Sequence, residues 1–284
     1  MNKKINDVLE LEKIAMQVRR DILRQVHSCQ SGHPGGSLGC TDLLVALYFN
    51  TMTHNTLFNM KGMGEDLFFL SNGHISPVFY SVLARAGYFD IAELATFRKL
   101  NSRLQGHPTT HEHLPGIRMS AGSLGQGLSV AIGAAISKKI KADSSLVFVL
   151  MGDGEQNEGQ VWEAAQFAPH HKVDNLIAFI DVNGQQIDGP TEKVMNNRDL
   201  AEKYKAFGWH VMHMNGNNMQ EVVQILAEAK QATGKQIPIA IMMQTEMGAG
   251  VDFMMGSHKW HGVAPNDEQL VTALAQLPET LGDY

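Results

Sequence analysis

The stretch LVFVLMGDGEQNEG at residues 146–159 contains the signal that decides the fold. It begins with an apolar run of leucine, valine and phenylalanine, which is typical of a strand buried in a parallel sheet. The run ends abruptly in Gly152, Asp153 and Gly154. Ligands of open parallel sheets bind at the carboxyl ends of strands, where glycine permits close approach of the backbone. The stretch therefore predicts a buried strand whose end contacts a ligand, with Asp153 supplying an anionic oxygen.

The second half of the chain alternates strand-like and helix-like segments. The expected strands are residues 146–151, 176–181, 209–214 and 238–243, and the expected helices are residues 158–168, 199–207 and 219–232. This alternation is the pattern of a parallel sheet with right-handed crossovers. The sequence therefore predicts an α/β fold, a parallel sheet covered by helices on both faces.

The first half is expected to add helices and one short strand. Residues 8–26 carry apolar side chains at steps of three and four, which predicts an amphipathic helix. Residues 30–37 break that helix, and Thr41 is the expected N-cap of a second helix that runs to residue 49. The remaining expected elements are a strand at 68–70 and a helix at 128–139. Because no linker or repeat interrupts the chain, residues 1–284 are predicted to form one domain.

Composition excludes several classes of protein. The formal charge of −6 gives no basic field for the phosphates of nucleic acid. No apolar run approaches the roughly 20 residues of a membrane helix, and the N-terminal residues have no apolar signal core. Cys29 and Cys40 are too few for a disulfide framework and are expected to be packing residues in a reducing compartment. We therefore expect a soluble, cytoplasmic protein.

A metal site is predicted at two neighbouring strand ends. Asn183 follows the strand at 176–181 and lies 30 residues after Asp153, about the length of one strand–helix–strand unit. One carboxylate, one amide oxygen and a backbone carbonyl form an incomplete oxygen shell, which Mg²⁺ accepts when a phosphate supplies the other ligands. A Gly-Asp-Gly sequence alone is more often a simple turn. A dinucleotide fingerprint is rejected, because Asn157 stands where the third glycine is needed.

Histidines are abundant, and most carry no signal of their own. The chain has 13, and a lone histidine is usually a surface or core residue. His107, His111 and His113 are close enough in sequence to raise the alternative of a zinc site. A flexible Pro-Thr-Thr segment intervenes and no cysteine is nearby, so their spacing fits a zinc pattern poorly.

Six segments together resemble transketolase. The Gly152–Gly154 turn followed by Asn183 is similar to the thiamine diphosphate signature. The other five segments, in the same order as in transketolases, are SGHPG at 31–35, LSNGH at 70–74, GHP at 106–108, GSLGQG at 122–127 and SHKWHG at 257–262. Because complete transketolases are much longer, the resemblance implies the diphosphate-binding domain alone, as in the N-terminal subunit of a split transketolase with the thiamine diphosphate-binding fold.

The resemblance implies roles for particular residues. It assigns the divalent ion, Mg²⁺ or else Ca²⁺ or Mn²⁺, to the side chains of Asp153 and Asn183 and the backbone carbonyl of Gln185. Gly154 and Asn183 would also face the diphosphate, with His74 and His261 beside it. The implied neighbours of the aminopyrimidine are Gly122, Ser123 and Leu124. The implied substrate-channel residues, which act in catalysis, are His33, His107 and His261. Glu158 matches an acidic residue at the subunit contact.

The implied reaction is transfer of a two-carbon ketol unit from a ketose phosphate to an aldose phosphate. In this family a glutamate of the pyrimidine-binding domain activates the cofactor, and the resemblance implies that this chain does not carry that domain. The resemblance therefore implies a partner, a C-terminal transketolase subunit carrying that glutamate, most simply in an α2β2 assembly.

Two other classes remain as alternatives. One is another thiamine diphosphate enzyme, such as 1-deoxyxylulose-5-phosphate synthase or the α chain of a 2-oxoacid dehydrogenase; the SGHPG and GHP segments argue against both. The other is a non-catalytic thiamine diphosphate-binding protein, which would not need the channel histidines.

Two details of the chain depart from the family pattern, and one residue has no assigned role. Arg118 stands where the family usually has an acidic residue, and we interpret it as a sign of a different partner surface or substrate charge. Ser123 replaces a proline that is common in single-chain members. His258 either joins the site or shapes the loop before His261.

Overall fold

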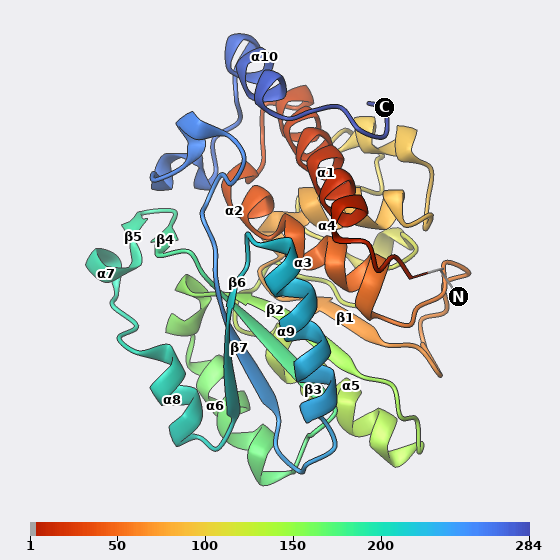
Figure 1. The fold of residues 1–284 in the computed structure, drawn as a ribbon, viewed down its shortest axis with the longest axis vertical. Helices are drawn as coiled ribbons and strands as arrows, with labels where there is room; N and C mark the ends of the chain where they lie inside the picture. The colour runs from red at the N-terminus through yellow and green to blue at the C-terminus, as the bar shows by residue number, and fades with distance from the viewer. Residues whose placement is uncertain (1–3) are drawn as a thin grey trace.

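The computed structural model describes residues 4–284 and is built on a five-stranded parallel sheet (Figure 1). Its strand order is β1-β2-β3-β7-β6, and every neighbouring pair is parallel. The strands are β1 Leu67–Leu70, β2 Val147–Gly152, β3 Leu176–Val182, β6 His210–Asn215 and β7 Ile239–Gln244. All five predicted strands are confirmed, because long apolar runs bounded by turns are the clearest strand signal in a sequence.

Helices pack on both faces of this sheet and enclose two hydrophobic cores. One face is covered by α1 Val8–Ser28, α3 Thr41–Ala46, α4 Ser76–Arg85 and α9 Met219–Ala232. The other face is covered by α5 Gly127–Ile140, α6 Gly159–His170 and α8 Leu200–Ala206. Alternate strand residues feed the two cores: Phe148 faces the first and Val149 the second. The predicted α/β fold with helices on both faces is therefore confirmed.

The remaining elements are short, apart from α10. They are α2 Pro34–Gly39, α7 Thr191–Val194, α10 Asp267–Gln276, the π-helical turn η1 Leu47–Thr51, the hairpin strands β4 Gln185–Gln186 and β5 Gly189–Pro190, and the 3-10 turns η2 Gly73–Ile75, η3 Ile91–Thr96, η4 Thr110–Glu112, η5 Gly154–Asn157, η6 Asp252–Met254 and η7 His258–His261. Most of these turns lie in the loops that follow strands, where ligands of such folds bind. No helix in residues 4–284 has the length and apolar character needed to cross a membrane.

The predictions for residues 30–49 were partly wrong. The supposed break contains the short helix α2, which begins at Pro34, because proline suits the first turn of a helix. Thr41 is not an N-cap: it is the first residue of α3, and its hydroxyl donates to the Ser37 carbonyl at 2.9 Å. The helix expected to reach residue 49 instead ends at residue 46 and passes into a π-helical turn.

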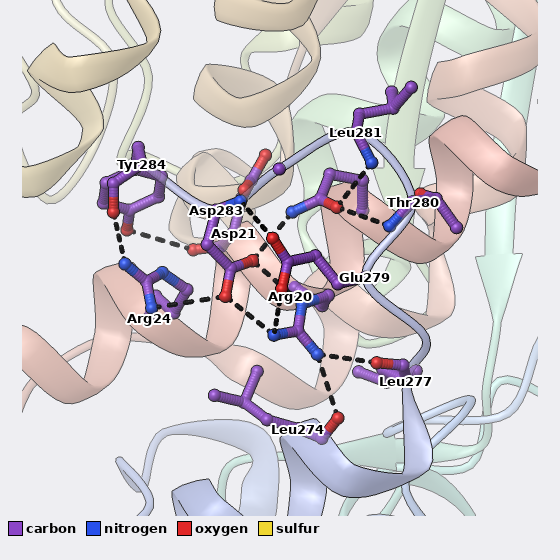
Figure 2. Close-up of polar contacts among 12 residues, drawn as sticks. Arg20, Asp21, Arg24, Leu274, Leu277, Glu279, Thr280, Leu281, Asp283 and Tyr284 are labelled. Carbon is purple, nitrogen blue, oxygen red and sulfur yellow. Dashed lines mark hydrogen bonds and ion pairs between the residues drawn. The ribbon is translucent and has the colours of Figure 1, made fainter.

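The segment after α10 folds back along α1 and is held there by charged hydrogen bonds (Figure 2). Arg20 donates to the Asp283 carboxylate through Nε at 2.8 Å and Nη2 at 2.7 Å, and this partner lowers the pKa of Asp283 to about 2. The Gln17 side-chain oxygen accepts the backbone N–H groups of Thr280 and Leu281 at 3.0 Å each. Arg20 also donates to the carbonyl of Leu277 at 2.7 Å. These contacts fix α10 against α1, and so anchor the loop that precedes α10.

Candidate active site

The ends of β2 and β3 lie side by side, because Gly152 pairs with Asp181 in the parallel register. Asp153 follows β2 directly. Its carboxylate accepts the N–H of Gly154 at 2.7 Å and reaches across to accept the N–H of Gly184 at 2.7 Å. The Asp153 turn and the Asn183 turn are therefore joined, as their spacing in the sequence predicts.

The side chain of Asn183 is held by its neighbours in one orientation. Its Nδ2 donates to Asp181 at 2.7 Å, and its Oδ1 accepts the N–H of Gln185 at 2.9 Å. Because the amide nitrogen is engaged by a buried carboxylate, the amide oxygen is the group that faces the loop. Gly184 has a φ of +72°, a conformation that glycine adopts without strain.

Asp153 and Asp181 form a buried acidic pair. Their residues are only 4% and 2% exposed. Burial and the nearby Asp181 carboxylate raise the pKa of Asp153 to about 7, and burial raises that of Asp181. Two buried carboxylates with raised pKa values would be stabilised by a cation at this point. The donor set therefore fits a divalent ion bound by oxygen ligands.

The same loops leave polar atoms free for a ligand. Among the described residues, Oε1 of Gln185 and Nε2 of Gln186 are buried without a hydrogen-bond partner. A Cβ atom placed on Gly154 would lie 3.3 Å from that of Gln186, so a side chain there would crowd the hairpin.

Within residues 4–284 no group of three His, Cys, Asp or Glu side chains is arranged to hold a metal ion, which argues against the zinc alternative at His107, His111 and His113.

Four histidines from four separate segments converge beside these turns. The ring centroids of His33 and His74 are 5.1 Å apart, those of His33 and His261 are 5.6 Å apart, and those of His74 and His261 are 5.0 Å apart. The ring centroid of His107 lies 6.5 Å from that of His33. The metal loop is adjacent, because a Cβ atom on Gly262 would lie 3.1 Å from Ile187 and 3.6 Å from His33.

The cluster favours neutral imidazoles. Burial, together with His261, Arg98 and His107, lowers the pKa of His33 to about 4. The pKa values of His74, His107 and His261 are lowered as well, in each case chiefly by burial. Nδ1 of His33 and Nδ1 of His261 are buried and have no partner among the described residues. A neutral ring with a free nitrogen can accept a hydrogen bond or a proton from a ligand.

The loop predicted to lie beside the aminopyrimidine borders this cluster. A Cβ atom on Gly122 would lie 3.6 Å from the ring of His107. Gly122 and Ser123 are exposed and Leu124 is half-buried, so all three have surface available for contact. Glu158 is exposed at the N-terminus of α6, and its side chain lies against Gly125. The structure therefore brings His33, His74, His107 and His261 together and joins the turns of Asp153 and Asn183.

Two residues of uncertain role can now be placed. Arg118 forms an ion pair with Glu65 at 3.3 Å, lies over the ring of Phe58 and donates to the carbonyl of Asn59. Our interpretation of Arg118 as a partner or substrate contact was wrong, because its side chain is 7% exposed and packs internally. His258 lies close enough to His261 to lower the pKa of that ring further.

The sequence reasoning missed three residues that shape the site. Asn197 donates to the backbone carbonyl of Asp153 at 2.6 Å, and Asp181 orients Asn183 as described above. Glu155 is 3% exposed and accepts hydrogen bonds from two glycine N–H groups of the site loops. Glu155 lies within the stretch that decided the fold, but nothing in its spacing separates it from the polar residues around it.

A parallel sheet with a joined Asp and Asn turn and a histidine cluster at its carboxyl edge defines the diphosphate-binding half of a thiamine diphosphate-binding protein. The family described as "Transketolase, thiamine diphosphate binding domain" matches residues 11–279. The chain belongs to this family.

Relatives of two lengths are similar to the chain. The 6-deoxy-6-sulfo-D-fructose transketolase subunit SqwG of Clostridium sp. (strain MSTE9) is 38% identical over 95% of this chain and 96% of its own length. An apulose-4-phosphate transketolase subunit of Phocaeicola vulgatus is 36% identical over 96% of each chain. The transketolase structure from Leishmania mexicana superposes with a TM-score of 0.87 at 31% identity, covering 94% of this chain but 41% of that one. The chain thus spans nearly the full length of the two subunits and less than half of that transketolase.

We expect the contribution of His33 to the free energy of unfolding to fall as the pH drops from 7 to 5. His33 has a pKa near 4 when folded against 6.5 as the ordinary value, so the unfolded chain binds more protons between these values. The stability from the neutral ring is fully present above pH 6.5 and is lost as the pH falls toward 4, by up to about 2 kcal/mol at pH 5. Urea unfolding at each pH measures it. His33→Asn should remove this contribution, so the stability of the variant should fall less than that of the wild type between pH 7 and pH 5. His210→Asn, at an exposed histidine, should leave the dependence as it is in the wild type; an equal change for His33→Asn and the wild type would contradict the assignment.

Proposed function

We propose that this chain is the N-terminal subunit of a thiamine diphosphate-dependent transketolase. Paired with a C-terminal subunit, it transfers a two-carbon ketol unit from a ketose phosphate to an aldose phosphate. The observation that carries the proposal is the convergence of His33, His74, His107 and His261 beside the joined Asp153 and Asn183 turns. A protein that only bound the cofactor would need the turns but not the cluster of neutral histidines beside them.

The cofactor and its ion are assigned to the strand-end loops. Asp153, Asn183 and the backbone carbonyl of Gln185 hold the divalent ion, Mg²⁺ or else Ca²⁺ or Mn²⁺. Gly154 and Asn183 face the diphosphate. The buried acidic pair of Asp153 and Asp181 supports this assignment, because it needs a cation.

The other end of the cofactor is assigned to the loops around the histidines. His74 and His261 lie beside the diphosphate, and the aminopyrimidine lies against the loop of Gly122, Ser123 and Leu124. When bound, the cofactor supplies a nucleophilic carbon and a charged ring that accepts electrons as a carbon–carbon bond breaks.

The chain's own chemical contribution is made by His33, His107 and His261. Their lowered pKa values favour neutral imidazoles at neutral pH, so each ring can accept a hydrogen bond from a donor hydroxyl or hold its proton. The three rings thus orient the sugar and move protons at its hydroxyl groups.

A partner chain completes the site. The names of two relatives, which are called transketolase subunits, support a split enzyme. We infer that residues 1–284 form one diphosphate-binding domain and that the partner supplies the pyrimidine-binding domain and the activating glutamate, in an α2β2 assembly. Glu158, exposed next to Gly125, is assigned to the subunit contact. The two free cysteines fit a reducing compartment, so we place the enzyme in the cytoplasm.

Asp153→Ala tests the metal assignment. Loss of a residue that only hydrogen-bonds to a metal ligand lowers metal affinity by about 10–100-fold. Loss of the anionic ligand itself should therefore weaken Mg²⁺-dependent binding of thiamine diphosphate by at least that factor. Calorimetric titration of the assembled enzyme measures this. Asp188→Ala is the matched control, since Asp188 is an exposed carboxylate of the same hairpin region. Unchanged cofactor retention in the Asp153 variant would reject the metal assignment.

His107→Ala tests the channel assignment. The ring lies beside the Gly122 loop but makes no contact assigned to the ion. We therefore expect kcat for ketol transfer to fall about 100-fold or more, with a much smaller change in cofactor affinity. Steady-state kinetics and cofactor titration give the two quantities. His111→Ala, at an exposed histidine of the same loop, serves as the control. Equal losses in kcat and in cofactor affinity would remove His107 from the channel.

A further inference from the structure

Glu155 is a buried carboxylate that the proposed chemistry does not use. It lies in the turn η5 that follows β2 and is 3% exposed. No ion pair reaches it within residues 4–284. A buried carboxylate without a cation costs free energy unless hydrogen bonds compensate it. Its presence beside a site for an anionic cofactor therefore needs a specific reason.

The hydrogen bonds of Glu155 supply that reason. Oε1 accepts the N–H of Gly125 at 2.7 Å and the hydroxyl of Ser71, and Oε2 accepts the N–H of Gly152 at 3.1 Å. The Ser71 hydroxyl in turn accepts the N–H of Gly127 at 3.1 Å. One side chain thus joins the end of β1, the loop that leads into α5 and the end of β2.

These three segments are the ones that surround the proposed cofactor. Ser71 precedes His74, Gly125 follows the loop of residues 122–124, and Gly152 precedes Asp153. The close packing leaves little freedom, because a Cβ atom on Gly127 would lie 2.3 Å from Ser71 and one on Gly125 would lie 2.7 Å from Glu158. The three segments are therefore packed closely as well as joined by hydrogen bonds.

We propose that Glu155 is a positioning residue, which holds these three segments in the arrangement that binds the cofactor before the cofactor arrives. The inference rests on the proposed function, since it assigns the segments to thiamine diphosphate. The chemical requirement is for two acceptor oxygens on one side chain. A carboxylate offers both, whereas glutamine offers one acceptor and turns an NH₂ group toward the other donor.

Glu155→Gln is the direct test. In the full-length chain without ligand, hydrogen exchange at the N–H groups of Gly125 and Gly152 should accelerate about tenfold or more at one or both positions, the effect of one lost buried hydrogen bond. Exchange in β3 should stay unchanged. In the enzyme assembled with its partner, the dissociation constant for thiamine diphosphate in Mg²⁺ should rise by a similar factor. Glu228→Gln, on the exposed face of α9, should change neither quantity.

Ser71→Ala provides a second variant in case the first does not fold. It leaves the carboxylate and both glycine donors in place but removes the acceptor of the Gly127 N–H. We expect faster exchange at Gly127 and weaker cofactor binding, with Gly152 still protected.

The outcomes separate positioning from mere stability. A lower melting temperature with unchanged cofactor affinity in the folded variants would make Glu155 a stability residue only and overturn the inference. Unchanged exchange at Gly125 and Gly152 in Glu155→Gln would overturn it as well. If the assembled wild-type enzyme bound no thiamine diphosphate, the proposed function would fail, and the inferred cofactor role of Glu155 would fail with it. Altered exchange would then show only that Glu155 ties the three loops together.

Discussion

The parallel pairing of β2 with β3 is the constraint on which the rest of the site depends. Its register places Gly152 opposite Asp181, so the turns after both strands emerge together. The Asp153 carboxylate then joins the second turn through the Gly184 N–H. A shift of one residue in this register would turn every side chain of a strand to the opposite core. Because both faces of β2 and β3 are buried in different cores, the register is fixed by packing far from the site.

The site combines an acidic end and an imidazole end, and burial shifts the pKa values at both. Burial raises the pKa values of Asp153 and Asp181, which creates a demand for a cation. The same effect lowers the pKa values of the histidines, which removes their charge. One physical cause therefore shapes both the acidic turns that we assign to a metal with its diphosphate and the imidazoles that we assign to sugar hydroxyls.

The sequence predicted the structural features that depend on local residue patterns and on the spacing between motifs. The strands were predictable from their apolar runs, and the meeting of Asp153 with Asn183 from one strand–helix–strand interval. The role of Glu155 was not, because its partners are backbone N–H groups of Gly125 and Gly152 and a serine far away in sequence, which leave no pattern to read. Arg118 was misread because its partners, Glu65 and Phe58, come from a loop with no periodicity. The helix α10 was missed although its capping box, Asn266 with Gln269, was visible in the sequence.

The central claim is that this chain holds one half of an active site and needs a second chain to complete it. Native mass spectrometry of the protein isolated from its source, with Mg²⁺ and thiamine diphosphate present, tests this claim most directly. The account predicts equal numbers of this chain and of a second chain related to the C-terminal part of transketolase, and ketol transfer only when both are present. Recovery of the chain alone or only with copies of itself, or full activity without a second chain, would contradict it.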